Sequence, residues 1–334
     1  MKKSMLGKVA ASGVVALGLS MAATPAFAAI DFSTATWLVG GVNYQFESTG
    51  TDTYGGVEYL TTPTQANDSL GYEEMYWDGG DLVPYDDYGY CYGADATETT
   101  EANGDVVISC AAYELTNDVW MGQDFRFFHD QPLTRHVFWI ENRGTAAADL
   151  DAASEANYLY WYLSSYDKEA SSTDPTSCSS PTGAETWIVA AGSADTTITG
   201  IAWQAKDATT WTGGGDCSTD YFEAYLNKDS LAAGEKVNYA TFIATSEPAG
   251  ASSGEMDTAF AAAVSGMTAF DSLNETLCRG IEGTTVEGWG TCPATLPNTG
   301  IDSSTTATVG LMGAVALVAG FAAIVVVRRR AAQQ

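Results

Sequence analysis

Hydrophobic and polar residues alternate in short runs along most of the chain, and clusters of Gly, Asn, Asp and Ser separate these runs. Alternation with a period of two is typical of strands that bury one face. The pattern predicts strands over residues 36–47, 56–61, 105–114, 119–128, 133–142, 156–165, 186–191, 198–206, 220–226 and 236–245. About ten such runs, separated by turn residues, predict a mainly β fold, a β-sandwich of two sheets.

The first of these runs has a slip in its alternation at Gly40 and Gly41. The apolar residues around this slip are Trp37, Val39, Val42, Tyr44 and Phe46. A glycine pair inside a strand pattern indicates a β-bulge. We therefore predict one bulged strand over residues 36–47.

One segment near the C-terminus has a helical period instead. Residues 252–255 read Ser-Ser-Gly-Glu, the pattern of a capping box at the start of a helix. The apolar residues Met256, Phe260, Val264 and Met267 follow at spacings of four, four and three. They share one face of a helix. The sequence thus predicts one amphipathic helix that packs on a sheet.

The N-terminus has the features of a cleaved signal peptide. Basic residues precede an apolar run from Val9 to Ala23, and Pro25 ends that run. The run has about 15 residues, whereas a membrane span needs about 20. Ala26 and Ala28 form a small-x-small cleavage site. We predict cleavage after Ala28 and a secreted protein.

The C-terminus has three parts in order. Residues 296–300 read Leu-Pro-Asn-Thr-Gly, residues 308–327 are apolar, and residues 328–330 are three arginines. A helix of 20 residues rises about 30 Å, the thickness of the bilayer core. The arginines would keep that end on the cytoplasmic side. The precursor is therefore predicted to carry a membrane helix.

This tail resembles the LPxTG sorting signal of Gram-positive surface proteins. The resemblance implies that sortase, a cysteine transpeptidase, cuts between Thr299 and Gly300 and holds the Thr299 carbonyl as a thioester. An amine of the peptidoglycan precursor then displaces the enzyme, which leaves the protein covalently anchored to the cell wall. The matching residues are Leu296, Pro297, Asn298, Thr299 and Gly300. In this reaction the protein is a substrate, and the mature product lacks the membrane helix.

These two ends define the predicted domain organisation. Residues 1–28 are the signal peptide, 29–292 a disulfide-stapled β-sandwich region, 293–300 the sorting motif segment, and 301–334 the cleaved spacer, membrane helix and basic tail. Within the folded region, residues 231–235 introduce a strand that is followed by the helix, by Gly280 and Ile281, and by Trp289. This arrangement resembles the end of secreted actinobacterial sandwich domains. The resemblance supports the fold and implies no active site.

The folded region is strongly acidic. Of 42 acids and 14 bases in the whole chain, 41 acids and 8 bases remain once both ends are removed. Between Ala29 and Asp124 there are 18 acids and no Lys or Arg. Such a field excludes electrostatic binding to nucleic acid or to an anionic lipid surface. The 46% apolar and 11% aromatic content supports a packed core and argues against disorder.

All six cysteines lie in the folded region: Cys91, Cys110, Cys178, Cys217, Cys278 and Cys292. An even count in a secreted chain, without a Cys-x-x-C pair, favours disulfides over a metal site. Six cysteines allow 15 connectivities. We prefer the sequential set Cys91–Cys110, Cys178–Cys217 and Cys278–Cys292, because each pair then brackets one loop-rich segment.

The two histidines of the folded region, His129 and His136, are seven residues apart. Strand side chains alternate with period two, so an odd spacing does not place both on one face. We therefore predict no metal site from this pair, and a solvated or hydrogen-bonded role for each. The chain also lacks the Gly-x-Ser-x-Gly, His-Glu-x-x-His and phosphate-loop motifs of common enzyme classes.

Residues 72–92 hold six tyrosines, one tryptophan and six acids, and no base. Aromatic faces and carboxylates together are typical of carbohydrate sites. The candidate ligand residues are Tyr76, Trp77, Asp78, Asp81, Asp86, Asp87 and Tyr88. Alternatively, the segment is a long loop, closed by Cys91, whose tyrosines pack on the sheet. Its aspartates could also hold Ca²⁺, although they lack the regular spacing of a calcium loop.

These features favour a non-enzymatic binding or structural module anchored to the cell wall. Its predicted partners are sortase, peptidoglycan bound through Thr299, and a neutral glycan or the surface of a host or neighbouring cell. No organic cofactor is expected. The alternative is a wall-bound carbohydrate-active hydrolase that uses a carboxylate pair, because 41 acids leave room for such a pair.

Overall fold

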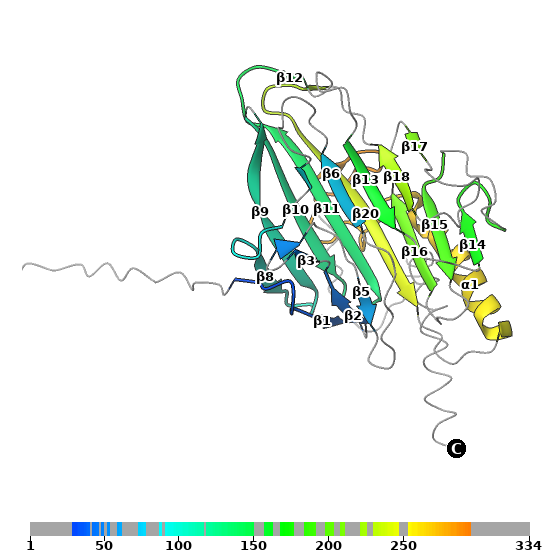
Figure 1. The fold of residues 1–334 in the computed structure, drawn as a ribbon. Helices are drawn as coiled ribbons and strands as arrows, with labels where there is room; N and C mark the ends of the chain where they lie inside the picture. Colours follow the sequence, from blue (N-terminus) through cyan, green and yellow to red (C-terminus); the bar gives the residue numbers. More distant parts are fainter. Residues whose placement is uncertain are drawn as a thin grey trace, which may run out of the picture.

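A computed structural model shows a mainly β protein with one α-helix among the residues it describes (Figure 1). These residues are 29–40, 42–46, 48–49, 52–53, 59–61, 73–77, 87–88, 91–116, 118–149, 157–162, 168–176, 184–191, 198–203, 208–210, 221–225, 230–246 and 253–294. Within these ranges, no helix is long and apolar enough to cross a membrane. The signal peptide and the predicted membrane helix at residues 308–327 lie outside them.

The larger sheet has ten strands and runs in the order β14-β15-β16-β20-β11-β10-β9-β8, with β21 and β22 beside β20. Its strands are β8 (Thr97–Thr100), β9 (Val106–Thr116), β10 (Val119–Phe127), β11 (Leu133–Asn142), β14 (Lys168–Ser171), β15 (Trp187–Ala191), β16 (Ile198–Trp203), β20 (Lys236–Ser246), β21 (Thr285–Val286) and β22 (Gly290–Thr291). Its pairs are antiparallel, except that β21 runs parallel to β20.

The alternation predicted the long central strands well. β11 has the predicted bounds, and β10 ends one residue before the predicted end. The edge strands β8 and β14 were not predicted, because Thr97–Thr100 and Lys168–Ser171 have no apolar alternation. Backbone pairing with β9 and β15 holds them in the sheet.

The smaller sheet has five strands in the order β17-β18-β13-β6-β7. They are β6 (Glu73–Trp77), β7 (Asp87–Tyr88), β13 (Asn157–Tyr162), β17 (Ala208–Thr210) and β18 (Tyr221–Tyr225). In Figure 1, β6, β13 and β18 are drawn in front of the larger sheet, as a second layer. The predicted two-sheet sandwich is thereby confirmed.

The first predicted strand is a hairpin and not one bulged strand. β1 (Trp37–Val39) pairs antiparallel with β2 (Val42–Gln45), and Val39 is opposite Val42. The chain reverses at Gly40, whose φ of 63° lies in the left-handed region that glycine adopts without steric cost. Gly40 therefore belongs to a tight turn between β1 and β2. β2 also pairs with β5 (Tyr59–Thr61).

Two short strand pairs complete the described sheets. β3 (Ser48–Thr49) pairs with β4 (Asp52–Thr53), and β12 (Ala148–Asp149) pairs with β19 (Ser230–Leu231). The turn after β19 leads directly into β20, and the helix follows. This order of a turn, a strand and a helix is the one predicted for the segment that begins at residues 231–235.

The predicted helix is α1 (Ser253–Met267), followed by a short 3₁₀ helix over residues 268–271. Its apolar face contacts β15 and β16 of the larger sheet. Met267 is buried, and Met256, Phe260 and Val264 pack against the same core cluster. Gly200 on β16 permits this close approach, because a Cβ there would lie 2.6 Å from the Met267 sulfur. Ser252 of the predicted capping box lies outside the described residues.

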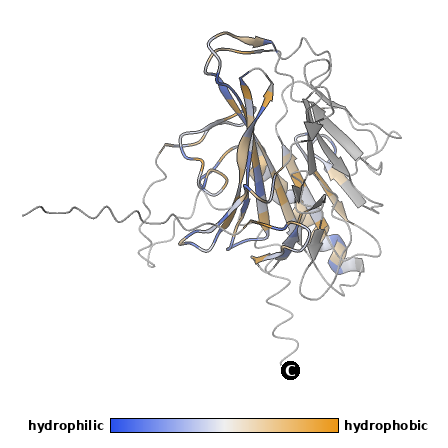
Figure 2. Ribbon diagram, turned by 60° about the vertical axis from the view of Figure 1, so that its left-hand side comes forward, coloured by the Kyte–Doolittle hydropathy of each residue, from blue (hydrophilic) through white to orange (hydrophobic). Residues whose placement is uncertain are grey.

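Each face of the larger sheet is covered by a hydrophobic core cluster. One cluster joins strand residues such as Phe125 and Phe138 to Phe32, Trp37 and Phe46 of the N-terminal segment. The other joins Phe242 and its neighbours to α1 and to the C-terminal segment. Figure 2 shows blue, hydrophilic stretches within these central strands. Gln123, Arg126 and Arg135 are polar residues of these strands that are buried, and buried polar groups need partners.

Candidate functional site

The structure bears on four of the predicted ligand residues. Tyr76 and Trp77 lie in β6, and Asp87 and Tyr88 lie in β7, so part of the predicted loop is paired strand. Tyr76 is opposite Tyr88, and Trp77 is opposite Asp87. Because neighbouring positions of a strand belong to opposite faces, the four residues do not share one face. Asp78, Asp81, Asp86, Ala26, Ala28 and the sorting signal Leu296–Gly300 lie outside the described residues.

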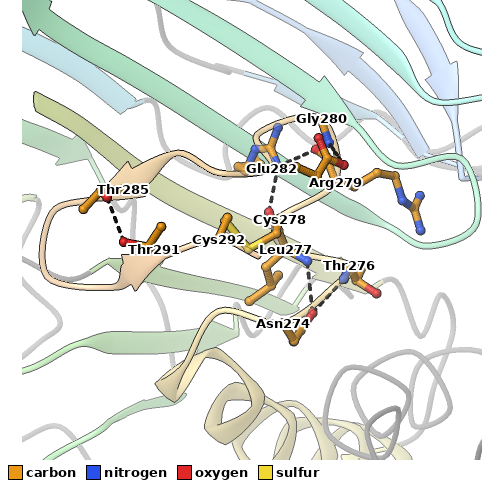
Figure 3. Close-up of a disulfide and its surroundings, with 11 residues drawn as sticks. Asn274, Thr276, Leu277, Cys278, Arg279, Gly280, Glu282, Thr285, Thr291 and Cys292 are labelled. Carbon is orange, nitrogen blue, oxygen red and sulfur yellow. Dashed lines mark hydrogen bonds between the residues drawn. A yellow bond between two sulfur atoms is a disulfide. The ribbon is translucent and has the colours of Figure 1, made fainter. Parts of the chain in front are cut away.

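Two of the three preferred disulfides are present. Cys91 is bonded to Cys110, with their Cα atoms 5.2 Å apart. Cys278 is bonded to Cys292, with Cα atoms 5.5 Å apart (Figure 3). The predicted Cys178–Cys217 bond lies outside the described residues and stays a prediction.

The Cys278–Cys292 loop lies on a cluster of three arginines that surround one ring. The guanidinium carbons of Arg126, Arg135 and Arg279 lie 5.9, 6.0 and 5.3 Å from the centre of the Phe128 ring. Arg126 and Arg135 are directly opposite on β10 and β11, and both are buried. Arg279 follows Cys278 in the loop. Such contacts between guanidinium groups and an aromatic face are attractive.

Asp105 provides the central negative charge of this cluster, and its side chain is fully buried. Its Oδ2 lies 2.7 Å from Arg126 Nη1 and 3.0 Å from Arg279 Nη1. The backbone N–H of His129 donates to its Oδ1 at 2.9 Å. Glu101 forms a two-pronged contact with Arg126, at 2.6 and 2.8 Å. Two carboxylates thus compensate the buried charge of Arg126.

These contacts determine the protonation states of the Asp105 and Glu101 carboxyl groups. Burial alone raises the pKa of Asp105, but hydrogen bonds from the His129 N–H, Arg279 and Arg126 outweigh it, so the pKa lies below its usual value. The hydrogen bond from Arg126 likewise lowers the pKa of Glu101. Both carboxylates are therefore held in the charged form.

Arg135 connects the central strand β11 to the loop through the backbone. Its Nη1 donates to the carbonyls of Leu277 at 2.7 Å and Arg279 at 2.8 Å. Burial, and then the nearby charge of Arg126, lowers the pKa of Arg135 to about 9. We call the Cys278–Cys292 loop together with Arg126, Arg135, Arg279 and Asp105 the C-terminal clamp.

The contacts of the clamp join parts of the protein to one another. Each guanidinium group donates to carboxylates or carbonyls of the protein itself. This cluster was not predicted from the sequence, although the sequence carries a signal for it. Pairing the predicted strands 119–128 and 133–142 as a hairpin puts Arg126 opposite Arg135, and two like charges in one buried sheet require counter-charges.

The two histidines occupy different environments. His136 is buried, its Nε2 lies 2.9 Å from Gln123 Oε1, and its ring stacks on Phe125 with centroids 4.2 Å apart. This confirms a hydrogen-bonded role for His136. His129 is exposed and contributes its backbone N–H to Asp105. Among the described residues, no group of three or more His, Cys, Asp or Glu is arranged to hold a metal.

A second set of cations lies over two tryptophans at one end of β10, β11 and β20. The Arg143 guanidinium lies 4.4 Å from the centre of the Trp120 ring, and Lys236 Nζ lies 3.9 Å from that of Trp139. Glu141 accepts a hydrogen bond from Arg143 Nε at 2.8 Å. Each cation is attracted to the face of the tryptophan ring beneath it, and these contacts stabilise the end of the sheet.

Several buried hydroxyl groups are left without a partner. Within the described part of the chain, the hydroxyls of Tyr44, Thr134, Thr199 and Thr245 make no hydrogen bond. Thr199 and Thr245 are directly opposite on β16 and β20. Burial raises the pKa of Tyr44.

We predict that Tyr44→Phe stabilises the fold by about 1 kcal/mol at pH 7, because a buried unpaired hydroxyl is costly. The effect should grow above pH 10. There the unfolded tyrosine ionises while the folded one, with its raised pKa, stays neutral, so the wild type loses stability as the pH rises. Denaturant melts of both proteins at pH 7 and pH 11 measure this difference. A loss of stability at pH 7 would contradict the prediction.

No family model matches the chain, and no curated protein matches it. Solved structures match at low similarity. A putative aldose 1-epimerase from Escherichia coli K12 has 8% identity and a TM-score of 0.38, over 64% of this chain and 98% of its own. One from Klebsiella pneumoniae has 8% identity and a TM-score of 0.35, over 62% and 77%. The GH36 α-galactosidase AgaB from Geobacillus stearothermophilus has 9% identity and a TM-score of 0.31, over 64% and 39%. Similarity at this level assigns neither a family nor an activity to the chain.

Proposed function

We propose that this protein is a secreted, non-enzymatic surface module that sortase attaches to peptidoglycan through Thr299. The proposal starts from the signal peptide at residues 1–28 and from the three-part tail at residues 296–330. The two disulfides support it, because such bonds persist in oxidising compartments outside the cytoplasm. In the precursor, the apolar tail would hold the chain in the membrane until sortase acts.

The observation that carries the proposal is the C-terminal clamp. A domain attached through its C-terminus experiences any pull at that end first. Here Cys292, four residues before Leu296, is bonded to Cys278. The adjoining residues bind Arg135 of β11 directly. They are also connected to Arg126 of β10 through Asp105, which Arg279 binds. The carbonyls of Cys292 and Pro293 also accept hydrogen bonds from the Gly283 N–H, at 3.1 and 3.2 Å. The clamp would pass a pull at the sorting motif directly into the central strands.

The tether between the clamp and the sorting motif is short. Only Pro293, Ala294 and Thr295 separate Cys292 from Leu296. Three extended residues span about 10 Å. The folded domain is therefore proposed to sit close to the wall, with no stalk between them.

Mass spectrometry of muramidase-digested walls tests the attachment. The expected C-terminal peptide ends at Thr299, with a peptidoglycan fragment linked to its carbonyl. In a Thr299→Ala and Gly300→Ala double variant, the protein should leave the wall fraction and accumulate in the membrane. An Asn298→Ala variant changes the position that the motif leaves open and is the matched control. Recovery of intact residues 300–334 on the bulk wild-type protein would refute the proposal.

A further inference from the structure

The turn between β8 and β9 contains the single Asn-Gly pair of the chain, Asn103 and Gly104. Both strands belong to the larger sheet, and Asp105 follows the pair directly. Asn103 is exposed, whereas the side chain of Asp105 is fully buried in the C-terminal clamp. An exposed amide therefore lies next to the central carboxylate of the clamp.

Two hydrogen bonds connect the Asn103 side chain to Asp105. Asn103 Oδ1 accepts from the Asp105 N–H at 3.0 Å. Asn103 Nδ2 donates to Asp105 Oδ2 at 3.2 Å. The same oxygen binds Arg126 and Arg279, at 2.7 and 3.0 Å. The amide group of Asn103 is therefore one of the donors that surround the Asp105 carboxylate.

The turn brings together the groups that an intramolecular reaction of this amide needs. The backbone nitrogen of the next residue can attack the side-chain carbonyl of an asparagine, and a glycine, which lacks Cβ, leaves that approach open. The Asp105 N–H already binds the Asn103 carbonyl oxygen, so it also stabilises the negative charge that develops there during attack. The Gly104 N–H donates to the Glu101 carbonyl at 2.9 Å. This bond must open before attack, so we expect a slow reaction.

We propose that Asn103 is a site of spontaneous deamidation and that this modification weakens the C-terminal clamp. The Gly104 nitrogen forms a bond to Asn103 Cγ, the bond between Cγ and Nδ2 breaks, and the proton of the Gly104 N–H leaves with the amide nitrogen as ammonia. The product is a cyclic imide. Water then adds to one imide carbonyl and breaks its bond to the ring nitrogen, which regains a proton. This step gives either an aspartate at position 103 or its isomer, in which the chain continues through the side-chain carbonyl.

The modification changes the sign of a contact in the clamp. In the aspartate product, the atom that donated to Asp105 Oδ2 becomes a carboxylate oxygen, so an attractive contact becomes a repulsion between like charges. The isomer instead adds a carbon to the backbone of the turn. In both products Asp105 holds Arg126 and Arg279 less firmly, and the Cys278–Cys292 loop loses part of its ionic connection to β10. The inference does not depend on attachment to the wall.

Ageing of the purified protein tests the reaction. The full-length chain in detergent is incubated at pH 9 in heavy-oxygen water, and its peptides are sequenced by mass spectrometry. We expect Asn103 to be converted with incorporation of one heavy oxygen. Asn274 is the internal control, because its Oδ1 accepts from the N–H groups of Thr276 and Leu277 in a similar turn but the next residue is Glu275. Asn103 should react about tenfold or more faster than Asn274, whose neighbour hinders the approach of the nitrogen.

Two variants separate the new charge from the loss of the amide. Asn103→Ser cannot form the imide, and its hydroxyl can still accept from the Asp105 N–H. The wild type should lose a few degrees of melting temperature on ageing, whereas Asn103→Ser should lose none. Asn103→Asp carries the charge of the product and should melt a few degrees below Asn103→Ser at pH 7. This difference should shrink toward pH 3, where the new carboxyl group is protonated.

Each result decides one part of the inference. An unmodified Asn103 after ageing, or conversion no faster than that of Asn274, would overturn the modification site. Equal melting temperatures of Asn103→Asp and Asn103→Ser at pH 7 would overturn its effect on the clamp, and so would an equal loss on ageing in Asn103→Ser and the wild type. None of these outcomes changes the wall-digest result, so attachment and modification are judged separately.

Discussion

Replacing Asp105 with asparagine is expected to lower the free energy of unfolding by about 3 kcal/mol. The carboxylate is fully buried and pairs with Arg126 at 2.7 Å and with Arg279 at 3.0 Å. Removing its charge leaves the buried Arg126 undercompensated, and it weakens the pairing of the partly exposed Arg279, which is more costly than the loss of an exposed pair. The expected loss lies at the lower end of the range for buried pairs, because Glu101 still binds Arg126. Denaturant melts of the full-length chain in detergent measure the change.

Asp130→Asn is the matched control for this substitution. Asp130 also pairs with Arg279, at 3.3 Å, but its side chain is 61% exposed. An exposed ion pair contributes about 0–1 kcal/mol, so this variant should be close to the wild type. Equal effects of the two substitutions would show that burial of Asp105 does not govern the stability of the clamp.

The free energy of unfolding should depend on pH through the carboxyl groups of Asp105 and Glu101. The pKa values of Asp105 and Glu101 are lowered in the folded state by their hydrogen bonds to the clamp. Their contribution is therefore present above the pKa values of the unfolded chain, about 4, and is lost as the pH falls through the lower folded values. The difference in unfolding free energy between wild type and Asp105→Asn should be constant from pH 5 to 7 and shrink toward pH 2. A difference that does not change with pH would contradict this assignment.

Removing the Cys278–Cys292 bond, by serine at both positions, is expected to cost about 3 kcal/mol. In the chain-entropy model, a bridge that closes a loop of about 15 residues stabilises the fold by that amount. The separation here is 14 residues. The variant should also become sensitive to proteolysis between residues 282 and 291, because β21 holds this hairpin to the sheet through one parallel pair, Asn238 with Val286. Melts and limited proteolysis followed by mass spectrometry measure the two effects.

The corresponding double serine variant of Cys91 and Cys110 is the control. This bond closes a loop of similar length, with a separation of 19 residues, so a similar loss of stability is expected. Its two cysteines are not members of the C-terminal clamp, although the loop that they close carries Asp105. Cleavage between residues 282 and 291 should therefore increase less than in the Cys278 and Cys292 variant. Early cleavage there in both variants would mean that the clamp depends on general stability and not on its own disulfide.

The sequence alone determined the features that depend on local chemistry. Strand β11 (Leu133–Asn142) was predictable because its apolar run over residues 137–140 leads into turn residues. Helix α1 (Ser253–Met267) was predictable because four apolar residues recur at spacings of four, four and three. The pairs Cys91–Cys110 and Cys278–Cys292 were predictable because cysteines that bracket a short loop can meet without a long closure. The signal peptide and the sorting signal are also local patterns, and they remain predictions.

Only the tertiary structure decided where the polar residues lie. Along β20, Tyr239, Thr241, Ile243 and Thr245 alternate with Asn238, Ala240, Phe242 and Ala244, which resembles a strand with one solvent face. In the fold, core clusters cover both sides of this strand, and Thr241 and Thr245 are buried. Alternation identifies two faces but does not show that a second layer covers each of them.

The tertiary structure also decided which residues from distant parts of the chain lie together. Arg126, Arg135 and Arg279 come from separate parts of the chain, and they form a clamp because β10 pairs with β11 and the disulfide brings the loop to them. Tyr76 and Tyr225 lie far apart in sequence, and they share a row because β13 pairs with both β6 and β18. Strand register is set by many backbone pairs at once, so a residue's own neighbours in sequence do not reveal which residues will lie beside it in the sheet.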